Sequence, residues 1–319
     1  MKAFIAESVT YLHPDKICDQ VSDAIVDACL AQDPTARVAL ETVGGHGSIS
    51  IYGELTTAAT INIPDIVQSY YRSITKKDIE VFTHVVTQSP EISQGVNTGG
   101  AGDQGVMVGY ACRENDAFLP QEMYLSRKLL QGIHIDAKSQ VTIIDDVIDS
   151  VVLSAQNHTP EELQARVTAA GIPANTKVYL NNTGAFTIGG FDADSGCTGR
   201  KIVVDAYGPR VPVGGGAFSG KDATKVDRSA AYMARWVALH LMHLHDAQEV
   251  LVRLGYVIGG DQPLIKQAIV DGREETFDID CRPDAIIERF NLRKPVYVKT
   301  ARDGHFGHIG VHAWESDFK

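Results

Sequence analysis

Two stretches of the chain carry residue types that bind polyphosphates, and one of them is GGGAFSGKD at residues 214–222. It fits most of the phosphate-binding pattern G-x-x-x-x-G-K, with Gly215, Gly220 and Lys221 in the expected places. That pattern continues with Ser or Thr, whose hydroxyl binds magnesium, but the next residue here is Asp222. The preceding YGPRVPV contains two prolines, which suits a central strand poorly. The sequence therefore predicts a loop whose glycines let backbone N–H groups approach an anion outside the usual nucleotide-binding fold.

The other stretch is ESVTYLHPDKICDQ, which leads into a predicted helix at 14–32. Apolar residues recur there at steps of three and four, and Pro14 suits the first helical position. The free N–H groups at the start of a helix favour anions, and His13 and Lys16 can contact phosphate directly. Asp15 could do so only through a divalent metal. Ordinary capping with solvated charges is the alternative that these residues leave open.

The charges are distributed unevenly along the 319 residues. The net charge of −11 argues against nucleic acid or an anionic membrane as a partner. Residues 1–60 carry eight carboxylates against three basic side chains, whereas the Gly-rich residues 195–230 carry six basic side chains against three acidic ones. A local basic segment with a flexible backbone indicates a site for a specific small anion, although a solvated surface loop would have the same composition.

Composition indicates a globular protein of the cytoplasm. The length allows two or three domains, and hydrophobic residues make up 44% of the sequence. No apolar run approaches the ~20 residues that a membrane span needs, and the start MKAFIAESVTYLHPDK is too polar for a signal peptide. The five cysteines are an odd number with no C-x-x-C pair, so we expect them to be reduced and buried.

Periodicity and turn residues predict helices interleaved with pairs of strands. Further helices are expected from Pro64, at 119–131, from the capping box at Thr159-Pro160-Glu161-Glu162 to Gly171, and at 226–246. Strands are expected at 37–43, 49–54, 80–87, 140–145, 147–154, 200–207, 249–259, 264–270 and 296–300. Because helix and strand do not alternate steadily, the pattern favours an α+β protein over a doubly wound parallel sheet.

Eight motifs occur in a fixed order along the whole chain: ESVTYLHPDKICDQVSDAIVDACL, GELTT, SPEISQGV, GAGDQG, DAKSQV, TGRKIVVDAYG, GGGAFSGKDATKVDRSAAYMAR and GHFG. Together they closely resemble the S-adenosylmethionine synthetases, or methionine adenosyltransferases. The resemblance implies an α+β fold of three structurally related blocks with pseudo-threefold arrangement, each a mixed or antiparallel sheet with helices on one face. We place these blocks at 1–97, 98–188 and 189–319.

The resemblance also implies a reaction and its partners. The family transfers the adenosyl group of ATP to the sulfur of L-methionine and hydrolyses the tripolyphosphate to pyrophosphate and phosphate, using magnesium and potassium. Its active sites lie between the subunits of a homodimer, and a tetramer stays open for this chain. The chemistry fits the residues, because a neutral thioether sulfur needs no general base, whereas a tripolyphosphate leaving group needs fixed positive charge.

Residues that match the family's motifs take their roles from the resemblance. Catalysis and phosphate contacts would fall to His13, Lys16, Arg200, Lys201, Lys221 and Lys225. The other ATP contacts, including stacking of Phe186 on the adenine, would fall to Asp103, Asp136, Lys138, Phe186, Asp194 and Ala217. Methionine would be held by Glu54, Gln94, Asp194 and Lys225. Asp15 and Asp227 would bind magnesium, and Glu41 would bind potassium.

The chain departs from the family between two of these motifs. Only Asn97, Thr98 and Gly99 separate SPEISQGV from GAGDQG, where family members usually have a longer loop that gates the site. This implies a compact member with a short gating loop and a more open site. Two other functions are considered: an ATP-hydrolysing P-loop protein, which needs a strand before Gly215, and an inactive relative that partners an active subunit. The full set of catalytic charges argues against the inactive relative.

Overall fold

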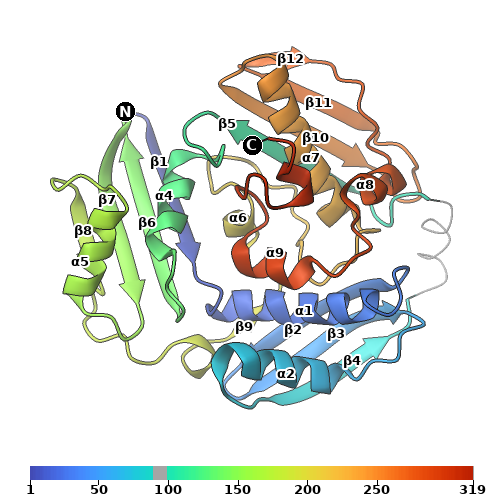
Figure 1. Cartoon of the computed structure of the whole chain (residues 1–319), viewed down its shortest axis with the longest axis horizontal. Helices are drawn as coiled ribbons and strands as arrows, with labels where there is room; N and C mark the ends of the chain where they lie inside the picture. The colour runs from blue at the N-terminus through green and yellow to red at the C-terminus, as the bar shows by residue number, and fades with distance from the viewer. Residues whose placement is uncertain (89–98, 319) are drawn as a thin grey trace.

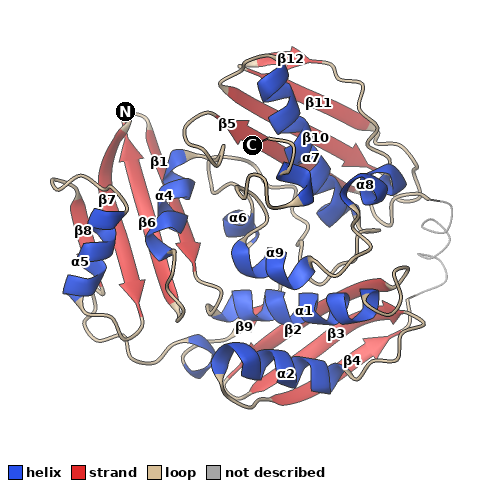
Figure 2. Cartoon of the chain, viewed as in Figure 1, coloured by secondary structure: helices blue, strands red, loops and turns tan. Residues whose placement is uncertain are grey.

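The computed structural model describes residues 1–88 and 99–318. Three four-stranded sheets surround a central region that contains the short helices α6 (Ile202–Asp205) and α9 (Tyr297–Asp303) (Figure 1). Each sheet carries longer helices on one face (Figure 2). The expected α+β class with three sheet-and-helix blocks is confirmed.

The first sheet has the order β4-β3-β2-β9 and packs its apolar side chains against α1 and α2. Val38, Leu40, Ile49 and Ile51 are buried and alternate with less buried positions, as expected for strands with one covered face. The elements are α1 (Pro14–Leu30), β2 (Arg37–Gly45), β3 (Ser48–Thr56), α2 (Ile63–Thr75), β4 (Glu80–Val86) and β9 (Gly196–Cys197).

The second sheet has the order β1-β6-β7-β8, with α4 and α5 beside it. The capping box is confirmed: the Thr159 hydroxyl accepts from the Glu162 N–H, and the Glu162 carboxylate accepts from the Thr159 N–H. The elements are β1 (Ala3–Val9), α4 (Gln121–Leu130), β6 (Ala137–Ile144), β7 (Val147–Ala155), α5 (Pro160–Ala169) and β8 (Lys177–Leu180).

The third sheet has the order β12-β11-β10-β5 and holds the largest hydrophobic cluster, packed against α7. Gly109 allows the closest approach, because a Cβ there would lie 2.0 Å from the Ala234 backbone of α7. The elements are β5 (Gly105–Cys112), α7 (Val226–Leu244), β10 (Glu249–Tyr256), β11 (Ile265–Val270), β12 (Arg273–Glu275) and α8 (Pro283–Phe290). In the described part of the chain, no helix has the length and apolar character needed to cross a membrane.

The three sheets exchange strands between distant parts of the sequence. β1, at the start of the chain, pairs with β6 in the second sheet. β5 pairs with β10, which follows it by more than a hundred residues, and β9 pairs with β2. The blocks therefore interleave, and the division at residues 97/98 and 188/189 stays a prediction.

Two strand predictions are wrong, and in both places a distant side chain determines the structure. Residues 202–205 form a helical turn instead of a strand, because Asp205 is held in a buried ion pair with Lys16. Residues 297–303 form α9, because the Asp27 carboxylate accepts hydrogen bonds from the first two N–H groups of this helix. Strands β1, β5, β8, β9 and β12 and helix α8 were not expected from the sequence pattern.

Candidate active site

The start of α1 holds His13 and Asp15 beneath the surface. His13 is the N-cap residue, and its Nδ1 accepts a hydrogen bond from the Asp15 N–H at 3.1 Å. Burial, followed by the nearby ammonium groups of Lys201 and Lys138, lowers the pKa of His13 to about 3. His13 is therefore neutral at physiological pH, and because Nδ1 accepts, its proton lies on Nε2.

Asp15 forms ion pairs with two basic side chains of the segment that follows β9. Its carboxylate lies 2.6 Å from the Lys201 Nζ and 3.1 Å from the Arg200 Nε, and it also accepts from the Cys197 N–H at 2.9 Å. Burial works against this charge, but the hydrogen bonds from Lys201 and Cys197 outweigh it and lower the pKa of Asp15. The carboxylate is thus ionised, which is the form that binds a metal, and both of its oxygens are engaged by groups of the 197–201 segment.

Asp136, directly before β6, and Lys138, on β6, belong to the same region, because the charge of Lys138 acts on the pKa of both His13 and Asp136. The Asp136 Oδ2 accepts from the Gly190 N–H at 2.9 Å, whereas its Oδ1 is buried without a hydrogen-bond partner among the described residues. Burial raises the pKa of Asp136, and the charges of Lys138 and Asp194 act on it as well. An unsatisfied buried oxygen indicates a place for a ligand donor. We call the set His13, Asp15, Asp136, Lys138, Asp194, Arg200 and Lys201 the α1 half-site.

A second group forms where residues 214–225 lead into α7. Lys221 Nζ lies 2.5 Å from the Asp227 carboxylate, and Lys225 Nζ lies 2.6 Å from that of Asp222. Gly216 allows this loop to pass close by, because a Cβ there would lie 2.1 Å from the Asp227 Oδ1. We call Lys221, Lys225 and Asp227 the lysine half-site.

Asp222, which replaces the hydroxyl of a P-loop, anchors this loop. It is buried, and its carboxylate accepts from the Val38 N–H at 2.7 Å and the Thr224 N–H at 2.9 Å. No strand lies between residues 208 and 220 in the described structure, so the strand that a P-loop protein needs before Gly215 is missing. The geometry therefore disfavours the P-loop interpretation.

Other expected residues lie around the lysine half-site. Glu54 lies opposite Ala39 across β2 and β3, and Ala39 in turn pairs with Lys221. Exposed Asp103 lies two residues before Gly105, where a Cβ would be 3.5 Å from the Asp227 Oδ1.

Three further expected residues lie in the described structure, and one falls outside it. Exposed Glu41 lies on β2, close enough to Cys197 to act on its pKa. Phe186 is half-buried, and its carbonyl oxygen accepts from the Asn157 N–H. Ala217 contacts the segment that leads to Arg200: a Cβ added to Gly199 would lie 2.6 Å from the Cβ of Ala217. Gln94 lies outside the described residues.

The two half-sites lie side by side along β2 but do not join. Lys221 pairs with Ala39, and Cys197, three residues before Arg200, pairs with Val43, so about 13 Å of β2 lies between these two pairing points. Among the described residues, no hydrogen bond or ion pair connects the two groups. The described residues also contain no group of three His, Cys, Asp or Glu side chains that could hold a metal ion.

Family models match the chain from end to end. The S-adenosylmethionine synthetase N-terminal domain matches residues 1–94, the central domain 98–186 and the C-terminal domain 188–316. The chain belongs to the S-adenosylmethionine synthetase family. The resemblance seen in the motifs is confirmed.

Individual synthases from three bacteria are similar over nearly the whole chain. The S-adenosylmethionine synthase of Petrotoga mobilis is 41% identical over 383 positions, covering 98% of this chain and 95% of that protein. That of Clostridium tetani is 40% identical, covering 99% and 97%, and that of Brachyspira hyodysenteriae is 39% identical, covering 98% and 95%. All three alignments, of 374 to 383 positions, exceed the 319 residues of this synthetase, which is therefore more compact than these relatives. The predicted short gating loop falls mostly in 89–98, outside the described residues.

In this synthetase, Lys16 faces away from both half-sites. Its Nζ lies 2.5 Å from the Asp205 carboxylate and 2.9 Å from that of Asp19. Burial disfavours the charge of Lys16, but the two carboxylates outweigh this effect and raise its pKa. Lys16 lines a cavity of about 660 Å³ between β1, α4 and α9. None of the other described residues that line this cavity belongs to the expected site. We therefore leave Lys16 out of the phosphate contacts.

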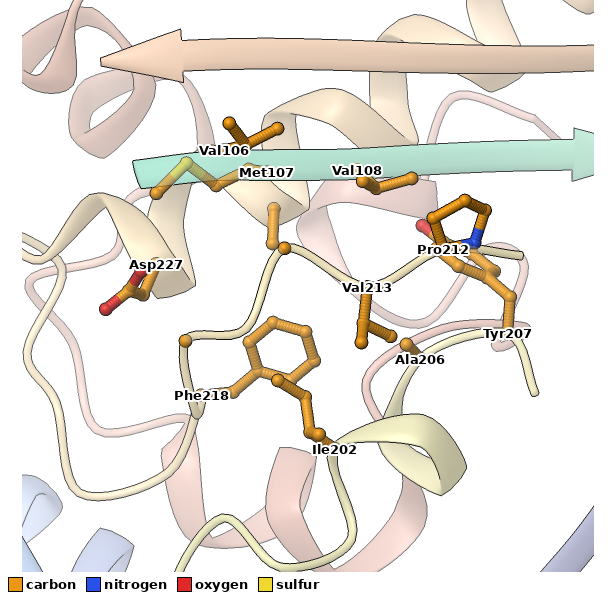
Figure 3. A pocket seen from close by; sticks show the side chains of 13 residues that line it. Val106, Met107, Val108, Ile202, Ala206, Tyr207, Pro212, Val213, Phe218 and Asp227 are labelled. Atoms are coloured by element: carbon orange, nitrogen blue, oxygen red, sulfur yellow. The ribbon is translucent and has the colours of Figure 1, made fainter. Parts of the chain in front are cut away.

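Figure 3 shows a small cavity beside Asp227. Its walls are mostly apolar, with Met107, Ile202, Tyr207 and Phe218 among them. The volume of about 20 Å³ is enough for little more than one water molecule. This cavity is therefore too small to hold a nucleotide.

Sequence reasoning overlooked the carboxylates that hold the site together. Asp205 and Asp222 each lie within the basic segment 195–230, yet both are buried and bind a lysine of that region or of α1. The only indication in the sequence was that carboxylates recur near lysines in a Gly-rich segment. This pattern does not distinguish a buried carboxylate that holds a lysine from a solvated one.

Proposed function

We propose that this chain forms S-adenosylmethionine from ATP and L-methionine, as a methionine adenosyltransferase, at a site that two copies of the chain build together. It then hydrolyses the tripolyphosphate to pyrophosphate and phosphate. The observation that carries the proposal is the division of the family's charged residues into two half-sites that remain apart within one chain. The α1 half-site of one subunit would face the lysine half-site of its partner.

The side chains present suit displacement at C5′ of ATP by the methionine sulfur. The sulfur carries no proton, so no general base is needed. The neutral His13, with its proton on Nε2, would donate a hydrogen bond to the phosphate oxygen that leaves C5′. Arg200 and Lys201 from one subunit and Lys221 and Lys225 from the other would hold the tripolyphosphate and stabilise its charge in the transition state.

The remaining contacts orient the two substrates. Phe186 would stack on the adenine, and Asp136, Lys138 and Asp103 would bind near the adenosine, with Ala217 beside the phosphates. The unsatisfied Asp136 Oδ1 supports such a contact. Glu54, Gln94, Asp194 and Lys225 would hold the methionine, whose ammonium and carboxylate require opposite charges.

Members of this family use metal ions, and two kinds fit the residues present. Asp15 and Asp227 would hold Mg²⁺, which is usually bound by one or two carboxylates together with substrate phosphates, not by a cage of protein ligands alone. A third carboxylate ligand in the same chain is therefore not required. Glu41 would hold K⁺ beside the site. When bound, Mg²⁺ supplies positive charge to the tripolyphosphate.

Exposed apolar side chains on the uncovered faces of the sheets support a homodimer. A tetramer built from two such dimers is the alternative assembly. Residues of this kind, each 44–53% exposed, are Ile5, Val43, Tyr52, Phe82, Val106, Tyr179 and Ile265. Glu41 and Glu54 alternate with the buried residues of β2 and β3 and so lie on the same face as Val43 and Tyr52. An interface on this face would bring the proposed potassium and methionine contacts of the two copies close together. All five cysteines are free, which fits the expected cytoplasmic location.

Mixed dimers test the shared site. Asp15→Asn and Asp227→Asn subunits with different affinity tags are expected to be inactive alone, because each removes one half-site from every active site. The purified heterodimer has one intact site and should recover about half of the wild-type rate of S-adenosylmethionine formation. An inactive heterodimer would show that both half-sites come from one chain. Wild-type protein that forms no S-adenosylmethionine with ATP, methionine, Mg²⁺ and K⁺ would instead indicate the non-catalytic partner.

A further inference from the structure

Four aspartates lie on α1 at steps of four residues, Asp15, Asp19, Asp23 and Asp27. This spacing places them along one face of the helix. Each carboxylate accepts a hydrogen bond from a backbone N–H of a distant segment: Cys197, Gly199, Gly220 and, for the last aspartate, both Tyr297 and Val298. α1 therefore fixes four distant points of the chain with one row of side chains.

Asp19 holds the residue directly before Arg200 and Lys201. It is fully buried, and its Oδ1 accepts from the Gly199 N–H at 2.8 Å. Gly199 has a φ of +81°, which favours glycine, and a Cβ there would lie 2.6 Å from that of Ala217. The backbone is thus fixed immediately before the two cations of the α1 half-site.

Asp23 fixes the backbone directly before Lys221 of the lysine half-site. Its Oδ1 accepts from the Gly220 N–H at 2.8 Å, and its two oxygens bind the Arg228 guanidinium at 2.6 and 2.7 Å. Arg228 in turn donates to the Lys221 carbonyl at 3.2 Å. Gly220 also has a φ of +81°, and a Cβ there would lie 1.9 Å from the Leu40 carbonyl oxygen. All of these groups except Lys221 are buried.

Asp27 makes the same kind of contact to a different part of the molecule. It accepts from the N–H groups of Tyr297 and Val298 at 3.0 and 2.9 Å and so caps α9. α9 carries no expected site residue. Asp27 therefore provides an internal comparison on the same helix, with the same kind of backbone contact but without the ion pairs that Asp19 and Asp23 form with Lys16 and Arg228, and with no connection to a phosphate-binding cation.

We propose that Asp19 and Asp23 are positioning residues, which set the places of the cations that bind the tripolyphosphate. The proposal rests on the function proposed above for Arg200, Lys201 and Lys221. Catalysis by fixed charge requires that the donors already be in place when the leaving group departs, because reorganising them would cost part of the stabilisation. Two neighbouring carboxylates on one rigid helix would fix both basic loops in a common frame.

Three isosteric substitutions test this proposal on the full chain: Asp19→Asn, Asp23→Asn and, as the matched control, Asp27→Asn. Binding of inorganic tripolyphosphate with Mg²⁺ is measured by calorimetry, its hydrolysis by phosphate release, and folding by thermal unfolding. We expect the first two variants to bind tripolyphosphate about tenfold or more weakly, as for loss of a charge-assisted hydrogen bond, and the control to change less than about twofold. Equal binding in all three variants would overturn the proposal.

Asp23→Asn leaves Arg228 buried without its partner, so this variant carries the larger risk of unfolding. In that case Asp19→Asn, judged against Asp27→Asn, decides the question. Amide hydrogen exchange gives a second measurement: it should rise at 197–201 in Asp19→Asn and stay at the wild-type rate there in Asp27→Asn. Arg200→Ala separates the two levels of inference. If Arg200→Ala binds tripolyphosphate normally, the phosphate-binding role proposed above for Arg200 fails. If Arg200→Ala binds weakly and Asp19→Asn binds normally, only the positioning role of Asp19 fails.

Discussion

The two half-sites neutralise their charges in different ways. In the α1 half-site, Arg200 and Lys201 converge on Asp15, which precedes Lys201 by 186 residues and is completely buried. In the lysine half-site, Lys221 pairs with Asp227 only six residues away, and both side chains keep some exposure. The first arrangement depends on the tertiary fold, whereas the second is local to one segment. Of the four predictions below, the first and third test this difference, and the other two concern positions outside both half-sites.

The largest effect is expected from Asp15→Asn. It removes a metal ligand and the common partner of Arg200 and Lys201, so kcat should fall about a thousandfold or more. The measurement is S-adenosylmethionine formation at saturating substrates. Asp227→Asn should also lose activity but should alter the unfolding temperature less, because its carboxylate binds one lysine and both side chains are partly exposed. Equal destabilisation by the two variants would contradict the comparison.

Acid stability should depend in part on His308, which lies outside both half-sites and acts in the same direction as His13 of the α1 half-site, whose pKa is also lowered. Burial, then Arg127 and His312, lower the pKa of His308 from about 6.5 to about 4. Between these values the unfolded chain binds a proton that the folded chain does not, so the free energy of unfolding should fall as the pH drops, by about 2 kcal/mol at pH 5. The raised pKa of Asp27, about 6, acts in the opposite direction and offsets part of this loss.

Urea unfolding at pH 7 and pH 5 checks the effect of His308. His308→Gln should reduce the loss of stability between the two values, while His245→Gln, at an exposed position, serves as the control. An unchanged loss in His308→Gln would show that other groups govern the acid limb.

Double-mutant cycles measure the two ion pairs directly. We expect a coupling of about 1.5 kcal/mol between Asp15 and Lys201, which are 0% and 16% exposed, because the pair is buried and hydrogen-bonded. The pair Lys221 and Asp227 should couple by less than about 1 kcal/mol, because solvent screens it. The variants are Asp15→Asn with Lys201→Met, and Asp227→Asn with Lys221→Met. A stronger coupling in the lysine half-site would reverse the comparison.

The smallest effect belongs to a position outside the site. Thr159→Ala removes the N-cap of α5 and should lower the free energy of unfolding by about 1 kcal/mol. It should leave both kcat and tripolyphosphate binding at the wild-type level. A change in either would show that the second sheet transmits strain to the half-sites.

The sequence pattern predicted the features that depend on neighbouring residues, but not those that depend on contacts between distant parts of the chain. The period of α1 and the capping box at Thr159 depend on neighbouring residues, and both were found correctly. By contrast, 202–205 and α9 adopt their structures because of Lys16 and Asp27, which lie far away in the sequence. β-branched residues favoured a strand at 202–205, and nothing nearby in the sequence indicated the buried ion pair.

The same limit applied to the candidate site. Motifs identified the types of the charged residues, but not their partners, so Lys16 was expected at the phosphates although it binds Asp205. Contacts such as Asp19 to Gly199 and Asp23 to Gly220 join segments 180 and 197 residues apart. A pattern within a short window cannot reveal such pairs. The individual roles of the site residues therefore stay proposals.

The exchange of strands between sheets has a consequence for how the chain folds. β2 gains its second partner only when β9, at residues 196–197, has been synthesised, and β5 must wait for β10 at 249–256. β1 emerges first but pairs with β6, more than a hundred residues later. A fragment that ends near residue 97 would leave β1 unpaired and one sheet without β9. Folding should therefore be slow and should approach completion only near the end of translation, with exposed strand edges that chaperones protect until then.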